Sequence, residues 1–121
     1  MVENPEYESP EAIRNGDRSR SSGGMWQLGI ILFEMLEGFS PFYDMSQSQI
    51  KRNILTKDLR ISKNISKDVR SLLCGLLEKD PTRRLGSRGI AEVKSHRAFK
   101  SINWKNLLIK EVRPPYLPEK N

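Results

Sequence analysis

The most apolar part of the chain is the stretch of residues 25–36, in which nine of twelve side chains are apolar. Apolar residues fall on nearly every face of a helix drawn through it, and such a helix must be surrounded by other protein. Gly38 follows at a position where glycine commonly ends a helix. The stretch is shorter than the roughly 20 apolar residues needed to cross a bilayer. We therefore predict a buried helix here and no membrane span.

Two further segments carry one apolar face at helical spacing. Ile50 and Ile54 lie four positions apart, as neighbours on one side of a short helix over 46–56. Ser66 is a suitable N-cap for a second helix, which must end before Pro81 because proline disfavours helical geometry in the residue before it. The apolar stripe of this second helix consists of Val69, Leu72, Leu73, Leu76 and Leu77.

The remaining segments read as loops and short helical pieces. Residues 14–24 contain three Gly and three Ser and no apolar side chain, which predicts a loop. A basic loop over 82–89 leads to a short helix around 90–96, and 101–121 looks like one helical turn and an extended tail rich in proline. No segment shows the alternation typical of a strand. The predicted fold class is therefore all-α, in one small domain of 121 residues.

Positive charge is concentrated in the second half of the chain. Residues 1–60 carry 7 Lys and Arg against 9 Asp and Glu, whereas residues 61–121 carry 14 against 6. A basic face of this kind can attract nucleic acid. Because the cations alternate with apolar residues at helical spacing, we favour a solvated helix surface, and a nucleic-acid footprint or an acidic-lipid surface is the less favoured alternative.

Cys74 is the single cysteine of the sequence and cannot form an internal disulfide. Together with the absence of a signal-peptide pattern, this predicts a reducing intracellular compartment, the cytoplasm. Cys74 lies on the apolar side of its predicted helix, so we expect it, like Trp26, to be a packing residue. His96 has no second metal-type ligand at suitable spacing, and no metal site is expected.

Four segments, in this order and spacing, resemble the C-terminal lobe (C-lobe) and the first part of the C-terminal tail of a eukaryotic serine/threonine protein kinase of the AGC group. They are 5–11 (Pro-Glu-Tyr-Glu-Ser-Pro-Glu), 25–29 (Met-Trp-Gln-Leu-Gly), 80–86 (Asp-Pro-Thr-Arg-Arg-Leu-Gly), and 96–99 (His-Arg-Ala-Phe) leading to 102–104 and 114–118. The resemblance implies a partial C-lobe over 1–100 and the start of the tail over 101–121. The lobe would comprise a substrate-facing loop, the buried central helix and three further helices.

The resemblance assigns Arg84 as the partner of Glu11. A buried carboxylate is costly unless it is paired, and the planar guanidinium of arginine can give it two parallel charge-assisted hydrogen bonds. We expect a structural ion pair between these two residues. The alternative is that both are unrelated surface charges, which are common and contribute little to stability.

Glu34 lies within the apolar helix, where an unpaired carboxylate would be expensive. In the family pattern, the matching acid accepts a hydrogen bond from the tyrosine matched by Tyr7 and holds a substrate arginine that precedes the phosphorylated residue. Glu6 adds negative charge nearby. Glu8 matches a position that lines the pocket for the substrate residue directly after the phosphorylated one. The implied ligand is a basic protein or peptide. The alternative is that Glu34 simply emerges from the helix into water.

The motifs that carry out phosphoryl transfer in this family do not occur in the sequence. The transfer uses a Gly-rich loop, a Lys with its Glu, a catalytic Asp, and Asp and Asn residues that hold magnesium. Neither His-Arg-Asp nor Asp-Phe-Gly is present, and the glycine run at 86–89 lacks the required spacing. We therefore expect no catalytic, cofactor-binding or metal-binding residues in this chain. ATP and magnesium are implied only for a full-length parent.

Three positions depart from the family pattern. Gly24 replaces the acid that opens the central helix and anchors the catalytic loop, Asn4 replaces a threonine before Pro5, and Glu8 replaces a residue that is usually apolar. Because of these departures, the alternative of an inactive kinase stays open even for a longer chain that contains the catalytic motifs. The sequence thus predicts part of an AGC kinase that supplies substrate docking and scaffold.

Two other functions remain as alternatives. One is an inactive, kinase-derived interaction module that binds a basic peptide, the missing N-terminal portion of a kinase, or another kinase. The other is a basic helical protein that binds nucleic acid, which requires the cations of residues 79–113 to gather on one face.

Overall fold

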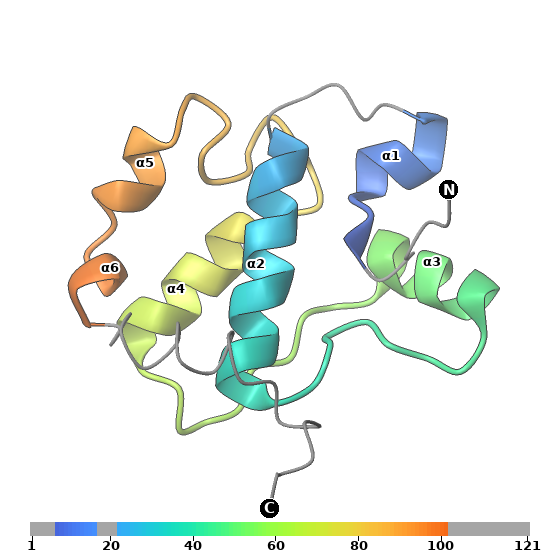
Figure 1. Ribbon diagram of the computed structural model, residues 1–121, viewed down its shortest axis with the longest axis horizontal. Helices are drawn as coiled ribbons and strands as arrows, with labels where there is room; N and C mark the ends of the chain where they lie inside the picture. Colours follow the sequence, from blue (N-terminus) through green and yellow to red (C-terminus); the bar gives the residue numbers. More distant parts are fainter. Residues whose placement is uncertain (1–6, 17–21, 102–121) are drawn as a thin grey trace, which may run out of the picture.

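The computed structural model describes residues 7–16 and 22–101, and the regular secondary structure within them is helical, with no strand (Figure 1). This agrees with the predicted all-α class. The helices are α1 (Pro10–Asn15), α2 (Ser22–Glu37), α3 (Gln47–Thr56), α4 (Lys67–Leu76), α5 (Ala91–Lys94) and α6 (Ala98–Ser101). The expectations for residues 1–6 and for the tail beyond Ser101 lie outside the described residues.

Local capping explains where several helices begin and end. Ser46 and Ser66 are the N-caps of α3 and α4, and their hydroxyl groups accept hydrogen bonds of 3.3 Å from the backbone N–H groups of Gln49 and Val69. Gly38 has a positive φ of 90° and donates its N–H to the carbonyl of Glu34 at 2.8 Å. The predicted caps Ser66 and Gly38 are therefore confirmed, and Ser46 is a further cap that was not predicted.

Several predicted boundaries were wrong. The loop predicted over 14–24 is interrupted, because the last residues of α1 extend into it and α2 already begins at Ser22. Helix α1 itself was not predicted, although Ser9 caps it by accepting from the N–H of Ala12 at 3.4 Å and a proline follows at the first helical position. The short helix expected around 90–96 covers only Ala91–Lys94.

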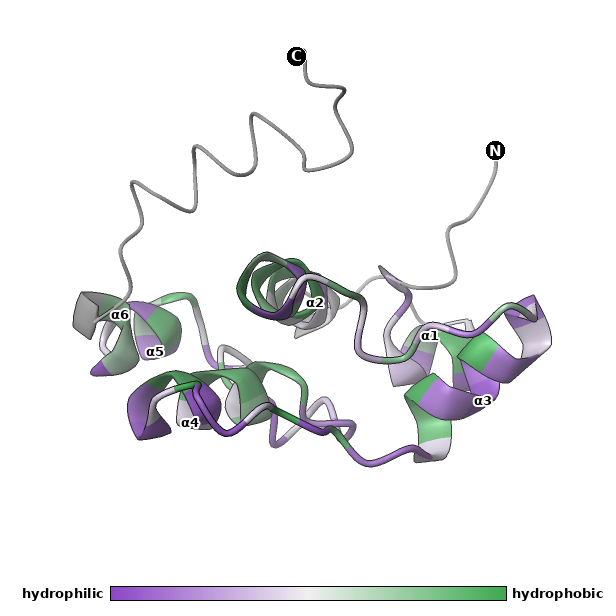
Figure 2. Ribbon diagram, turned by 90° about the horizontal axis from the view of Figure 1, so that it is seen from below, coloured by the Kyte–Doolittle hydropathy of each residue, from purple (hydrophilic) through white to green (hydrophobic). Residues whose placement is uncertain are grey.

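The described helices form two groups on either side of α2. Helices α1 and α3 lie together on one side of α2, and α4, α5 and α6 lie on the other (Figure 1). In Figure 2, where α2 is seen nearly end-on, this helix lies above α4, with apolar positions on much of its surface. Helix α2 is thus the central element that both groups share, as a helix apolar on most faces must be.

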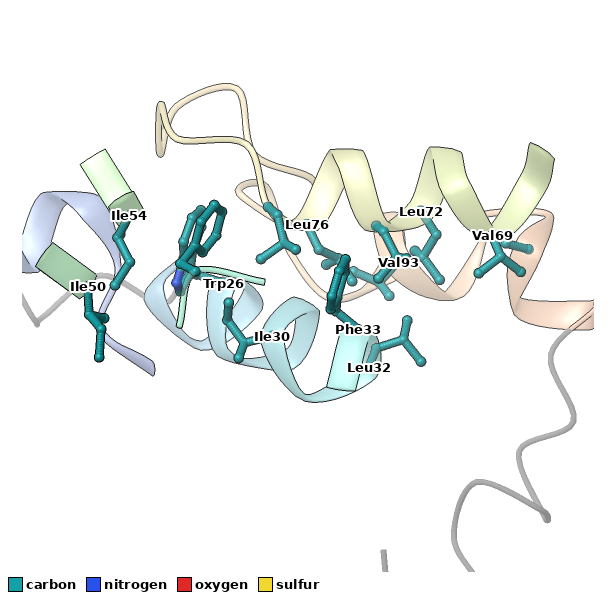
Figure 3. Close-up of a cluster of buried hydrophobic side chains, with 14 residues drawn as sticks. Trp26, Ile30, Leu32, Phe33, Ile50, Ile54, Val69, Leu72, Leu76 and Val93 are labelled. Atoms are coloured by element: carbon teal, nitrogen blue, oxygen red, sulfur yellow. The ribbon is translucent and has the colours of Figure 1, made fainter. Parts of the chain in front are cut away.

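The core forms where the apolar faces of these helices meet around α2. Figure 3 shows Trp26, Ile30 and Phe33 of α2 in one cluster with residues of α3, α4 and α5. The contributions of the other helices include Ile50, Ile54, Val69, Leu72, Leu76 and Val93. Trp26 is fully buried, as predicted.

Cys74 is an exception to the predicted packing, because it is exposed. It lies one residue from Leu73, which is fully buried. Neighbouring positions on a helix are rotated by about 100°, so a residue beside the apolar stripe readily faces solvent.

Helices α2 and α4 approach closely at Gly29. A Cβ atom at this position would lie 2.8 Å from Cδ2 of Leu77 and 2.9 Å from Cβ of Leu76. Only glycine permits this approach without movement of the neighbouring side chains.

Within the described residues, no helix is long and apolar enough to span a membrane.

Candidate functional site

Glu11 and Arg84 meet in the interior, beside the first turns of α1 and α2. Arg84 Nη1 donates to Glu11 Oε2 at 2.8 Å, and Nη2 donates to Oε1 at 2.9 Å. Their residues are 4% and 1% exposed, so the pair is withdrawn from water. The structure therefore brings together the two residues that the resemblance paired, in the two-bonded geometry that suits a guanidinium and a carboxylate.

Arg84 also organises the loop that carries it. Its Nε donates to the carbonyl of Glu78 at 2.8 Å, and Nη2 donates to the carbonyl of Lys79 at 3.3 Å. The guanidinium carbon lies 5.2 Å from the centre of the Trp26 ring. These contacts satisfy the donors of a buried cation and hold the loop between α4 and α5 against both α1 and α2.

The ion pair keeps Glu11 in its charged form. Burial acts to raise the pKa of Glu11, but hydrogen bonds from Arg84 and from the backbone N–H of Glu11, and the positive charge of Arg84, outweigh it. The pKa of this carboxyl therefore lies below its ordinary value of 4.5. Both oxygens of the Glu11 carboxylate accept hydrogen bonds from the guanidinium of Arg84.

The second pair that the resemblance named, Tyr7 and Glu34, is also in contact. Tyr7 Oη lies 3.0 Å from Oε1 and 3.1 Å from Oε2 of Glu34, so the hydroxyl donates to both carboxylate oxygens. Both side chains are half-buried. Tyr7 lies on the segment before α1, and Glu34 lies in the last part of α2. The tyrosine thereby fixes the direction of the carboxylate.

Glu8 and Glu6 are the other two residues that the sequence analysis expects near this carboxylate. Glu8 follows Tyr7 directly and is half-buried. Glu6 lies outside the described residues. The described part of the candidate docking site is therefore Tyr7, Glu8 and Glu34, which has two acids and a hydroxyl group. Such a set suits a cationic ligand, above all an arginine guanidinium.

The part of the chain that the structure describes contains no cluster of side chains suited to bind a metal ion. Within residues 7–16 and 22–101, no three His, Cys, Asp or Glu side chains lie close enough together to hold a metal ion. His96 instead contacts Ser71, with its Nε2 atom 3.1 Å from the hydroxyl oxygen, and its Nδ1 atom accepts the N–H of Ala98 at 3.0 Å.

Several of the cations in the basic half have partners within the chain. Arg97 Nε lies 2.6 Å from Asp68 Oδ1, and Arg88 Nη1 lies 3.6 Å from Glu92 Oε2. Arg84 is buried in its ion pair. A part of the positive charge that suggested nucleic-acid binding is therefore paired with carboxylates of the same chain.

Sequence reasoning missed Lys79. Its ammonium nitrogen lies 2.7 Å from the carbonyl oxygen of Ile54 and 4.3 Å from the centre of the Phe42 ring. No local pattern distinguishes Lys79 from the other lysines of the chain. Only its position directly before the segment over 80–86 could have drawn attention to it.

Comparisons with known proteins place these contacts in a family context. The profile of the family described as "Protein kinase domain" matches residues 1–99. Human "Serine/threonine-protein kinase Sgk1" is 43% identical over 115 residues, which cover 94% of this chain and 26% of that protein. "Serine/threonine-protein kinase gad8" of Schizosaccharomyces pombe is 41% identical over 114 residues, covering 94% of this chain and 20% of that protein.

A third relative comes from Encephalitozoon cuniculi. The "Probable cAMP-dependent protein kinase catalytic subunit" of this organism is 40% identical over 117 residues, which are 97% of this chain and 36% of that protein. The chain thus spans between 20% and 36% of the lengths of these three relatives.

Proposed function

Because this chain belongs to the protein kinase domain family, and within it to the AGC group of serine/threonine kinases, we propose that it is a C-lobe portion of such a kinase. In this proposal residues 1–100 form the partial lobe and residues 101–121 begin the C-terminal tail. The helical fold around α2 and the buried pair of Glu11 and Arg84 support the assignment. The compartment we propose is the cytoplasm.

The role that we propose for this portion is to dock a basic protein or peptide. The observation that carries this proposal is the Tyr7 hydroxyl, which bridges both oxygens of Glu34 at 3.0 and 3.1 Å. A carboxylate oriented in this way suits the planar guanidinium of a substrate arginine, which forms charge-assisted hydrogen bonds with carboxylates. Glu8 and Glu6 would add negative charge around the same ligand.

Phosphoryl transfer itself is proposed only for a full-length parent. In this family the reaction uses ATP with magnesium, held by an Asp and an Asn, and a catalytic Asp. The sequence contains neither His-Arg-Asp nor Asp-Phe-Gly, and the described residues hold no cluster of metal-type ligands. The residues of this chain therefore do not fit magnesium-ATP, and no catalytic step is assigned to them.

A second candidate is an inactive interaction module that binds a basic peptide, the remainder of a kinase, or another kinase. Gly24 favours it, because this residue stands where the family pattern has the acid that anchors the catalytic loop. Gly24 is exposed, and a Cβ atom at this position would meet nothing within 4 Å. The absence of the acid at this position is therefore not explained by a steric clash at Cβ.

Binding of a fluorescent peptide that carries arginines before a serine tests the docking role. We expect the anisotropy of the labelled peptide to rise with added protein, and the affinity to fall as salt increases. A peptide with citrulline in place of arginine has the same shape without the charge and should bind weakly. Equal binding of the two peptides would overturn the docking role, and peptide phosphorylation by the chain with magnesium-ATP would overturn the assignment of catalysis to the parent.

A further inference from the structure

His96 connects α6, the last described helix, to α4. It lies between α5 and α6, and its Nε2 atom is 3.1 Å from the hydroxyl oxygen of Ser71 on α4. Its Nδ1 atom accepts the backbone N–H of Ala98 at 3.0 Å. Ala98 is the first residue of α6, where backbone N–H groups lack a partner within the helix itself. The imidazole therefore caps α6, as an Asn or Asp side chain does when it accepts the N–H two residues further on.

These two contacts assign the protonation state of the ring. A neutral imidazole has one nitrogen that donates and one that accepts. Because Nδ1 accepts the N–H of Ala98, the proton of the neutral ring is on Nε2, which donates to the hydroxyl oxygen of Ser71. In the imidazolium ion both nitrogens donate, so an Nδ1–H group would face the N–H of Ala98. The cap of α6 therefore exists only while His96 is neutral.

The cap holds a segment that packs on the core. Ala98 is fully buried and belongs to the hydrophobic cluster, and Phe99 packs against the same cluster. Helix α6 lies against α4, where Arg97 Nε is 2.6 Å from Oδ1 of Asp68. A buried backbone N–H that loses its partner is costly. Loss of the cap would therefore weaken the packing of α6 against α4.

In the described part of the chain, no carboxylate forms an ion pair with His96. Asp68 is paired with Arg97, and Glu92 is paired with Arg88. A proton on the ring would therefore break the contact with Ala98 without forming a new ion pair. The charged residues on the elements next to the ring are Lys67, Asp68 and Arg70 of α4, Glu92 and Lys94 of α5, and Arg97.

We propose that His96 is a pH-sensitive cap, which holds α6 against α4 while the imidazole is neutral and releases α6 when the imidazole takes up a proton. Histidine is the side chain whose charge ordinarily changes between pH 5 and 8. The contact belongs to the neutral form, so its contribution to the stability of α6 is present at the higher pH and is lost as the pH falls. Helix α6 leads directly into residues 102–121, so the attachment of the segment from which they continue responds to pH. The proposal does not depend on the docking of a basic peptide.

The ring can be observed directly, because His96 is the single histidine of the sequence. In the full chain labelled with nitrogen-15, the signals of the two ring nitrogens distinguish a protonated from an unprotonated nitrogen. At pH 7.5 we expect the proton on Nε2 and an unprotonated Nδ1. The amide signal of Ala98 should shift together with the ring signals as the pH is lowered to about 5.5. A neutral ring with its proton on Nδ1, or an Ala98 amide that does not follow the ring, would overturn the proposal.

Hydrogen exchange of the same chain measures the release of α6. Between pH 7.5 and 5.5, we expect the protection of the α6 amides, relative to an unstructured peptide at the same pH, to fall by about fivefold, as for the loss of a helix cap. The range lies above the pKa of Glu11, which is below 4.5. An unchanged protection of α6 in this range would show that the proton does not release the helix.

The variant His96→Asn is the matched control. Its side-chain oxygen can accept the N–H of Ala98, but it does not titrate. All other titrating groups are the same in both chains, so the protection of α6 in the variant should stay constant between pH 7.5 and 5.5. An equal fall in the variant and in the parent chain would show that another group causes the change, and the proposal would be wrong.

Discussion

Glu11 and Arg84 are 73 positions apart in the sequence, yet they share two hydrogen bonds of 2.8 and 2.9 Å in the interior. The same short loop also carries Lys79, which bonds the last turn of α3. Both helices that these residues contact lie across α2 from α4 (Figure 1). The loop between α4 and α5 therefore joins the two groups of helices, by an ion pair at one point and by a lysine at another.

Removing Arg84 should be strongly destabilising. The variant Arg84→Met leaves the carboxylate of Glu11 buried without its partner, and breaking a buried pair from one side typically costs about 3–5 kcal/mol. Urea unfolding of the chain, followed by circular dichroism, measures the loss. A chain that no longer folds at all would also agree with a loss of this size.

Arg97 provides the matched control on the surface. Its pair with Asp68 is as short, at 2.6 Å, but the two side chains are 78% and 38% exposed. Pairs of this kind contribute about 0–1 kcal/mol, so Arg97→Met should change stability little. Equal losses for the two variants would contradict the structural role of the buried pair.

Stability should fall in acid because of Glu11. Its pKa in the folded chain lies below the ordinary value of 4.5, so its contribution is fully present above that value. The contribution is lost as the pH falls through the folded-state pKa. We expect the free energy of unfolding of the parent chain to decrease below pH 4.5, and the variant Glu11→Gln to show a shallower decrease. Identical slopes for the two proteins would show that Glu11 is not held ionised by Arg84.

Gly29 should resist substitution, whereas Gly24 should accept it. Alanine at 29 places a Cβ within 2.8 Å of Leu77, and overpacking of this kind costs about 1–3 kcal/mol. The Cβ atom of alanine at 24 meets nothing within 4 Å, and this position lies in the same helix. Gly24→Ala should therefore raise the free energy of unfolding by as much as about 1 kcal/mol. Thermal unfolding of the two variants measures both effects. A stabilised Gly29→Ala chain would contradict the close contact of α2 and α4.

Much of the fold could be predicted from the sequence, because local signals decided it. The caps at Ser46, Ser66 and Gly38 and the apolar stripes of α3 and α4 depend on spacing and on side-chain chemistry alone. The early start of α2 could not be predicted in the same way. Gly23 and Gly24 favour a loop when read locally, so the sequence alone predicts that the helix starts after them, although both lie within α2.

The candidate site likewise contains residues that the sequence identifies and others that it does not. Glu11, Arg84, Tyr7 and Glu34 could be named from the resemblance, because their motifs identify them. Their contacts bridge segments far apart in the chain, which no periodicity reveals. Lys79 carries no such signal, and its environment exists only because Phe42, Trp26 and the end of α3 meet in space.

A double-mutant cycle between Glu34 and a peptide arginine tests the docking role most directly. The cycle compares the affinities of the parent chain and Glu34→Gln for a peptide with arginine before the serine and for the same peptide with citrulline. Glu37→Gln is the control, because Glu37 lies on the same helix but accepts the backbone N–H of Ser62 at 2.7 Å. Citrulline replaces one arginine at a time, so that the position that meets Glu34 is identified.

The account predicts a coupling energy of at least about 1 kcal/mol between Glu34 and one arginine, as expected for a charge pair in direct contact. The same cycle with Glu37→Gln should give additive changes, within about 0.5 kcal/mol. Additive changes for Glu34 at every arginine position would contradict the proposal that this chain docks a basic peptide through the carboxylate that Tyr7 orients.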